Sequence, residues 1–160
     1  MKATDYLGLL SDLENEYGFI LANKARIDSA WGRLGQSPED LLLWYSYAYL
    51  VHNLYNGFEA YFHRISQFYE NGLPPDNWPK VLVDRMSSSI EGYRLAVLAS
   101  EDRASFQELR AFRHLVRHLY DRDIDPVRIR LVHTHVEDSL RRFPGIHRNF
   151  TDVVKRMAAS

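Results

Sequence analysis

The sequence contains no cysteine, which excludes disulfide bonds, a thiolate nucleophile and a cysteine-based zinc site. No window holds about eighteen apolar residues without charge, so we expect no helix that spans a membrane. The N-terminal segment MKATDYLGLLSDLENEY carries acidic residues within its apolar pattern, unlike the apolar core of a signal peptide. No glycine-rich phosphate loop is present. We therefore expect a soluble, cytoplasmic protein without a bound cofactor.

Strand-like alternation, internal repeats and low-complexity segments are also missing, and the composition is that of an ordinary globular protein. Residues 1–160 are therefore expected to form one domain. Lysine is scarce, with four residues against sixteen arginines, and the forked guanidinium group suits bidentate phosphate recognition. Acidic residues prevail in residues 1–100 and basic residues in residues 101–160. This asymmetry allows a local basic site, although a salt-bridged helical surface would explain it as well.

Apolar residues recur at steps of three and four along almost the whole chain, which predicts an all-α fold. Capping residues, prolines and glycines divide the pattern into segments. The first expected helix runs to about residue 31, the second over about 38–70 and the third from 79 to the high 90s. The fourth starts at the capping box Ser105–Glu108 and carries the motif described below. The fifth opens at Asp125-Pro126, and Phe143-Pro144-Gly145 separates a short last one. We expect an antiparallel helical bundle of about five helices.

Aromatic residues crowd the second of these segments and nearly encircle its helix. They are Trp44, Tyr45, Tyr47, Tyr49, Tyr55, Phe58, Tyr61 and Phe62. We interpret them as core and as helix or dimer contacts rather than as a platform for stacking nucleic-acid bases.

Residues 113–120, RHLVRHLY, form the pattern R-x-x-x-x-H-x-Y with Arg113, His118 and Tyr120. Arginine and histidine occur five residues apart at three further places, so that spacing alone carries little information. A tyrosine two residues beyond the histidine occurs only here. The pattern combines a permanent cation, a group that titrates near neutral pH and a hydroxyl that can be modified.

On a regular helix, Arg110, His114 and Arg117 gather on the polar face, and Tyr120 falls on the same line as Arg113. His118 lies roughly 140° away from Arg113, so the two side chains cannot meet as helical neighbours. Two arrangements would bring them together. The helix unwinds just after Arg117, or two protomers of a twofold dimer place both pairs in one cleft.

Such a cleft suits metal-independent RNA cleavage. One imidazole would remove the proton of a ribose 2′-hydroxyl, and a second would protonate the leaving 5′-oxygen. Arg113 would stabilise the charged phosphorane-like transition state. The alternative is that Arg113 and His118 are ordinary solvated residues of a polar helix face.

The segment ELRAFRHLVRHLYDRDID resembles the motif region of HEPN-domain proteins, specifically the HepT-like ribonuclease toxins of HEPN/MNT toxin–antitoxin pairs. LVHNLYNGFEAYFHRIS is similar to the family's H-x-x-Y-x-G-x-E helix, and LPPDNWPKVLVDRM to the stretch that follows it. These matches cover residues 40–125 in the family's order.

The resemblance implies a HEPN-like helical homodimer that cleaves transfer RNA or messenger RNA without a metal. Arg113 and His118 match the family's catalytic positions. Tyr120 matches the tyrosine that an MNT-type nucleotidyltransferase antitoxin modifies with AMP (AMPylation), which silences the toxin. A bulky anionic group there would occupy the phosphate site beside Arg113.

Four residues are weaker candidates. His114 and Arg117 would contact RNA. Asn56 and Glu59 would orient the catalytic arginine, with ordinary surface polarity as an equal alternative.

Two other functions and a metal site were weighed against this hypothesis. A non-catalytic HEPN module would bind nucleotide, RNA or a nucleotidyltransferase without cleaving, and a plain helical adaptor would carry the motif by chance. His133 and His135 stand two residues apart on a predicted helix and so face different sides, which makes them a poor metal pair. We expect no metal site. The intact Arg113–His118 pair favours the enzyme.

Overall fold

The computed structural model describes residues 2–70, 78–119 and 123–160. The described part contains five helices and no β-strand, which confirms the expected all-α bundle. The helices are α1 (Ala3–Gln36), α2 (Leu41–Glu70), α3 (Trp78–Met86), α4 (Ser100–Arg117) and α5 (Pro126–Ala158). None of these helices is long and apolar enough to cross a membrane.

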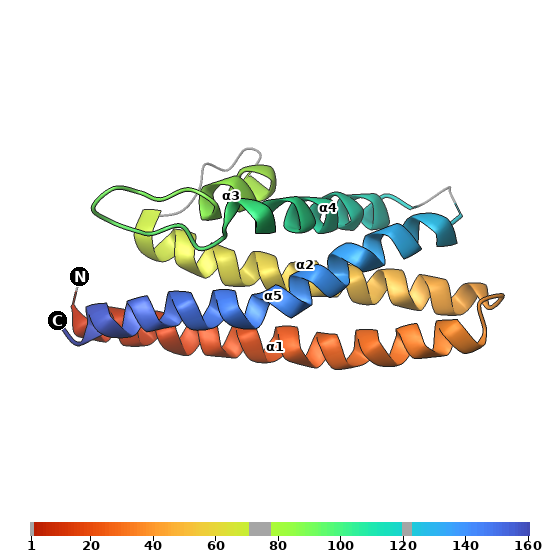
Figure 1. The fold of residues 1–160 in the computed structure, drawn as a ribbon, viewed down its shortest axis with the longest axis horizontal. Coiled ribbons are helices and arrows are strands. Elements are labelled where there is room, and N and C mark those ends of the chain that lie inside the picture. The colour runs from red at the N-terminus through yellow and green to blue at the C-terminus, as the bar shows by residue number, and fades with distance from the viewer. Residues whose placement is uncertain (1, 71–77, 120–122) are drawn as a thin grey trace.

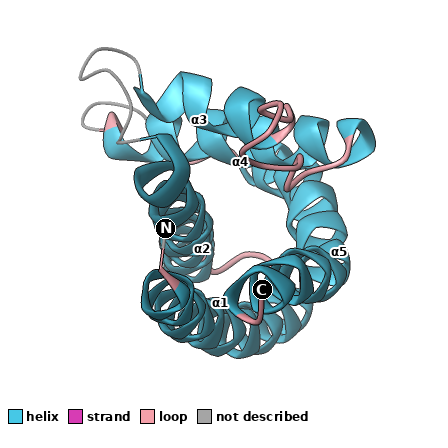
Figure 2. Cartoon of the chain, turned by 90° about the vertical axis from the view of Figure 1, so that its left-hand side faces the viewer, coloured by secondary structure: helices cyan, strands magenta, loops and turns pink. Residues whose placement is uncertain are grey.

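The four longer helices surround one core, and each runs antiparallel to its neighbours (Figure 1). Helix α1 packs along α2 and α5, and α4 bridges α2 and α5 on the other side of the bundle (Figure 2). The centre is aromatic: Phe58 and Phe62 of α2 contact Phe106 of α4, with ring centroids 4.9 and 5.4 Å apart. Phe143 of α5 lies 4.8 Å from Phe58. These contacts set how α2 and α4 align with each other.

Helix α1 is longer than expected and α3 is shorter. Gly32 and Gly35 do not end α1, because an isolated glycine costs only about 1 kcal/mol in a helix and α2 packs against α1. Helix α3 ends at Met86 rather than in the high 90s. Gly92 there adopts a φ of 75°, a left-handed conformation that a helix cannot contain, in a turn closed by the Ile90 N–H on the Arg94 carbonyl.

Helix α4 begins at Ser100, before the predicted capping box. The Asp102 carboxylate accepts the Ala99 N–H at 3.1 Å and so caps the helix there. Ser105 is buried and donates to Asp138 of α5 at 2.9 Å.

Helix α5 is continuous through Pro144, so the predicted separate last helix is wrong. A proline inside a helix removes one hydrogen bond. Phe143 and Ile146, both buried, hold the chain against the core on either side of it.

Two similar polar clusters cross the core where α1, α2 and α5 meet. Tyr47 Oη lies 2.5 Å from His133 Nδ1, and the imidazole stacks on Trp31 with centroids 3.5 Å apart. Tyr61 Oη lies 3.0 Å from His147 Nδ1, and that imidazole stacks on Tyr17 at 4.0 Å.

A carboxylate faces the other nitrogen of each ring. Glu137 Oε1 lies 3.5 Å from His133 Nε2, and Glu14 Oε1 lies 3.3 Å from His147 Nε2. The carboxylates favour a proton on Nε2, so each tyrosine hydroxyl donates to Nδ1. Both histidines are therefore structural parts of the core.

Candidate functional site

Arg113 points from α4 onto α2, where two polar side chains bind its guanidinium group. Its Nε donates to Asn56 Oδ1 at 2.6 Å, and its Nη1 donates to Glu59 Oε2 at 2.9 Å. The Arg113 side chain is only 14% exposed and that of Glu59 only 9%. The arginine is thus held by hydrogen bonds to charged and polar groups in a partly desolvated place, where such bonds are strong.

Two further α2 residues complete a set that we call the Arg113 socket: His52, Tyr55, Asn56 and Glu59. The guanidinium carbon lies 5.7 Å from the centroid of the Tyr55 ring, within the range of a cation–π contact. His52 lies one helical turn before Asn56 on α2, and burial together with the charge of Arg113 lowers the pKa of its imidazole. Spacings of three, four and seven residues place all four on one face of α2, because a helix repeats every 3.6 residues.

Gly57 lies within the same segment of α2 but faces the neighbouring helix α1. A Cβ atom at this position would lie 3.1 Å from Ile20 Cγ1 of α1, closer than ordinary van der Waals contact. The glycine therefore lets α1 approach α2 closely behind the socket.

Burial and the neighbouring arginines shift the pKa values of the socket. Burial raises the pKa of Glu59, and the positive charges of Arg113 and Arg117 oppose that rise. Burial and the same two arginines lower the pKa of His52, so its neutral form is favoured. Burial raises the pKa of Tyr55, which keeps its hydroxyl protonated. The socket therefore offers Arg113 one carboxylate and otherwise neutral groups.

The Arg113 Nη2 group makes no hydrogen bond to the part of the chain that the structure describes. Two of its N–H bonds remain to bind an anion, since a guanidinium carries five donors. The socket thus fixes the direction of the arginine and leaves donors for a phosphate group.

His118 lies just beyond the end of α4. The helix ends at Arg117, and His118 has φ −115° and ψ 17°, outside helical geometry. The helix thus ends where the first of the two expected arrangements requires, but the bonds of Arg113 go to α2 and that of His118 to His114, so a meeting of the two side chains stays a prediction. His118 Nδ1 donates to the His114 carbonyl oxygen at 2.7 Å, so Nε2 is the basic nitrogen of the neutral ring. His114, Arg117 and His118 are all exposed.

Tyr120 lies outside the described residues. Its position beside Arg113 therefore stays a prediction.

A model of the HepT-like protein family matches residues 46–154, which includes the Arg113 socket and the whole of α4. This chain belongs to the HepT-like family. Searches of curated proteins and of solved structures find no match. The HepT-like segment runs from the second turn of α2 almost to the end of α5, so every described candidate residue falls inside it.

The histidines of the other three arginine–histidine pairs with this spacing lie in surroundings that differ from those of His118. His133 and His147 are buried in the tyrosine clusters described above. His135 Nδ1 lies 3.2 Å from the Ser105 hydroxyl and faces α4, so it does not join His133. Among the described residues, no three histidine, aspartate or glutamate side chains gather in a group that could hold a metal ion.

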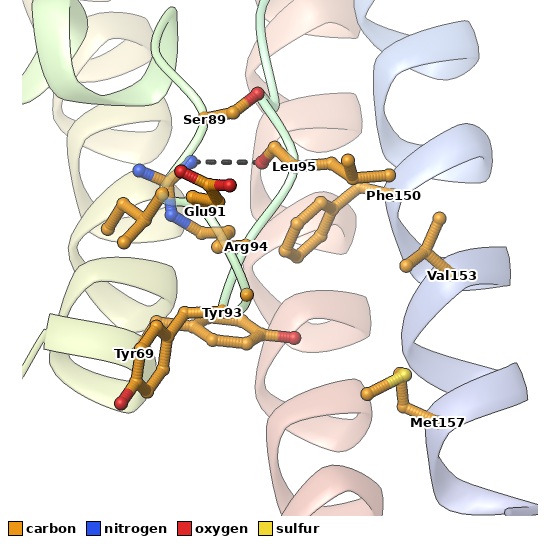
Figure 3. Close-up of a pocket in the computed structure, with 11 residues that line it drawn as sticks. Tyr69, Ser89, Glu91, Tyr93, Arg94, Leu95, Phe150, Val153 and Met157 are labelled. Atoms are coloured by element: carbon orange, nitrogen blue, oxygen red, sulfur yellow. Dashed lines mark hydrogen bonds between the residues drawn. The ribbon is translucent and has the colours of Figure 1, made fainter.

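An apolar pocket of about 440 Å³ lies between the 89–95 loop and α5. Figure 3 shows Tyr69 and Tyr93 on one side of it and Phe150, Val153 and Met157 on the other. Arg94 at its wall is bound to Glu70 at 3.0 Å. None of the residues that line this pocket belongs to the Arg113 socket.

Two residues near the site were not singled out from the sequence. His52 lies beside Asn56 on the face of α2 that holds Arg113, and its signal was the first letter of the H-x-x-Y-x-G-x-E pattern. Tyr49 belongs to the aromatic group interpreted as core and as helix or dimer contacts, and its side chain is 61% exposed. Tyr45 is also exposed, whereas the six other aromatic residues of that group are buried as expected.

Proposed function

We propose that this HepT-like protein is a metal-independent ribonuclease toxin of a toxin–antitoxin pair that cleaves transfer RNA or messenger RNA. Family membership points to a HEPN-type toxin module. The observation that carries the proposal is the Arg113 guanidinium group, which is hydrogen-bonded to Asn56 and Glu59 and still has N–H donors for a phosphate. It lies five residues before His118, which follows the end of α4.

In the proposed reaction, His118 Nε2 takes the proton of the ribose 2′-hydroxyl, and the 2′-oxygen forms a bond to phosphorus. The bond from phosphorus to the 5′-oxygen breaks, and a second imidazole, as imidazolium, donates a proton to that oxygen. The products are a 2′,3′-cyclic phosphate and a 5′-hydroxyl end. Arg113 stabilises the extra negative charge of the pentacoordinate transition state through its Nη2 donors.

A twofold homodimer supplies the second imidazole in this proposal, because each chain carries one copy of the motif. The exposed Arg117 then extends the positive surface along the RNA backbone, and the exposed His114 is a further proposed RNA contact. An MNT-type nucleotidyltransferase is the proposed antitoxin, and AMPylation of Tyr120 is the proposed means of silencing.

The direct test is cleavage of RNA by the wild-type protein and by the Arg113→Ala and His118→Ala variants, in the presence of EDTA. We expect the wild type to cut RNA and to stop growth on expression, and both variants to lose about a thousand-fold or more of the activity. His135→Ala is the matched control, since His135 also follows an arginine by five residues. If the wild type binds RNA without cutting it, the non-catalytic HEPN module is the better description. If EDTA abolishes cleavage and added metal restores it, the metal-independent mechanism is wrong.

A further inference from the structure

The first half of α2 exposes two tyrosines next to the candidate site. Tyr45 and Tyr49 are 38% and 61% exposed, and four residues separate them, so they lie one helical turn apart. A single exposed aromatic residue is common on protein surfaces. The residues around Tyr49 indicate what its exposed ring could bind.

Tyr49 lies on the part of α2 that extends from the socket in the direction of the end of α4. Helices α2 and α4 run antiparallel (Figure 1), and Arg113 is level with Asn56 and Glu59. Moving along α4 from Arg113 towards His118 therefore means moving along α2 from Asn56 towards Tyr49. The charge of Arg117 accordingly reaches His52, one turn from Tyr49. Tyr49 thus lies on the side of the socket towards the exposed Arg117 at the end of α4.

Tyr49 is also connected to the residues that hold Arg113. Its ring is nearly parallel to the His52 imidazole, with 15° between the planes and centroids 6.1 Å apart. His52 in turn lies one helical turn from Asn56, which accepts a hydrogen bond from Arg113. The exposed tyrosine therefore lies on the same face of α2 as the Arg113 socket.

An exposed aromatic face beside arginines fits a nucleic acid strand whose bases are unpaired. Phosphates follow the cations, and a base stacks on the aromatic ring. Bases inside a duplex already stack on their own neighbours, so an RNA loop or a single-stranded end suits this surface better. The positive surroundings disfavour a basic partner and complement a polyanion.

We propose that Tyr49 is the stacking surface for an unpaired base next to the phosphate bound by Arg113, so that the substrate is single-stranded RNA. The proposal deepens the proposed function and rests on RNA being the ligand of the Arg113–His118 site. His52 is a positioning residue in this arrangement, because it lies between the stacking surface and Asn56, which binds the arginine.

The test is a binding titration with a short fluorescein-labelled RNA of mixed sequence, alone and annealed to its complement, followed by fluorescence anisotropy. The protein carries His118→Ala so that the RNA stays intact, and Tyr49→Ala, Tyr49→Phe and Tyr93→Ala are added to it one at a time. Tyr93 is the matched control because it is 68% exposed and lies in the 89–95 loop beside the apolar pocket.

We expect Tyr49→Ala to weaken binding of the single strand roughly ten-fold or more. Tyr49→Phe, which keeps the ring, and Tyr93→Ala should bind it like the parent, and the duplex should bind more weakly and respond less to Tyr49→Ala. The proposal is overturned if Tyr49→Ala and Tyr93→Ala bind the single strand equally. It is also overturned if Tyr49→Ala turns a dimer into a monomer by light scattering, because Tyr49 then belongs to a protein interface.

The two proposals fail in different ways. Wild-type protein that binds single-stranded RNA through Tyr49 without cutting it overturns the ribonuclease and supports the stacking surface. If the wild type cuts RNA and the Tyr49→Ala variant binds and cuts RNA equally well, the ribonuclease is supported and the stacking surface is overturned.

Discussion

Arg113 and Glu59 are joined by a hydrogen-bonded ion pair, Nη1 to Oε2 at 2.9 Å, although 54 residues separate them in the chain. Both side chains are largely buried, so neither charge is compensated well by water if the other is removed. The pair connects the helix that carries the R-x-x-x-x-H motif to the helix that positions it.

Glu59→Gln should therefore lower both stability and activity. The amide keeps the shape but loses the charge, so we expect a loss of about 1–3 kcal/mol in the free energy of unfolding and a fall of roughly ten-fold or more in RNA cleavage. Urea unfolding and a cleavage assay measure the two effects. Asp12→Asn is the control, because Asp12 pairs with Arg64 at 3.7 Å on the surface and should change stability by less than about 1 kcal/mol. Equal effects of the two changes would contradict the structural role of the Arg113–Glu59 pair.

The two buried histidines of the core should make the protein acid-sensitive. Burial lowers the pKa of His133 and of His147, while Glu137 and Glu14 oppose the shift. The unfolded chain keeps the ordinary value of 6.5 and so binds protons at a higher pH than the folded chain. The stability contributed by the neutral rings is therefore complete above the unfolded pKa and is lost as pH falls below it.

We expect the urea concentration at the unfolding midpoint to decrease as the pH is lowered from about 7.5 to about 5.5. Replacing both residues, His133→Gln with His147→Gln, should flatten that dependence even if the protein becomes less stable at neutral pH. His135→Gln is the control and should leave the dependence as it is. The lowered pKa of His52 adds a smaller change in the same direction, so the double variant should retain a residual slope. An unchanged slope in the double variant would show that other groups cause the acid sensitivity.

Gly57 should tolerate no branched side chain. A Cβ would already lie 3.1 Å from Ile20 Cγ1, so Gly57→Val should destabilise the protein by about 1–3 kcal/mol through overpacking between α1 and α2. Gly18, exposed on α1 with no atom within 4 Å of a new Cβ, is the control. Gly18→Ala should raise the free energy of unfolding by about 0.5–1 kcal/mol, because alanine loses less entropy in a helix. A neutral Gly57→Val would mean that the two helices are packed less closely there.

Tyr120 should gain AMP when the protein is made together with a cognate MNT-type nucleotidyltransferase. The intact mass would rise by whole AMP units, and the modified protein would cut RNA much more slowly, because a phosphate near Arg113 would compete with the substrate. Tyr120→Phe should abolish both the mass increase and the silencing. Tyr93→Phe, which changes an exposed tyrosine elsewhere, should leave both. A mass increase that survives Tyr120→Phe places the modification on another residue.

Much of the fold and part of the site follow from local patterns. The step of three and four residues predicts the helices, and the spacing of Asn56 and Glu59 puts both on one face of α2. The motif pattern selects Arg113 and His118 from four pairs of equal spacing. All these inferences concern residues a few positions apart, where the geometry of a single helix is sufficient.

Local patterns failed where packing competes with propensity. Gly32 and Pro144 lie inside helices that the core holds together, and Gly92 breaks one that was expected to continue. The preference of a short segment is worth about 1 kcal/mol, which a buried aromatic contact easily exceeds.

The residue types of the site, their order and the helices that carry them were readable in the chain of 160 letters. The joining of Arg113 to Asn56 and Glu59, and the exposure of Tyr49 beside them, depend on how α4 lies against α2. That alignment is set by Phe58, Phe62 and Phe106 packing in the common core. Contacts between residues so distant in the chain arise from the fit of whole helix surfaces, and no local pattern encodes that fit.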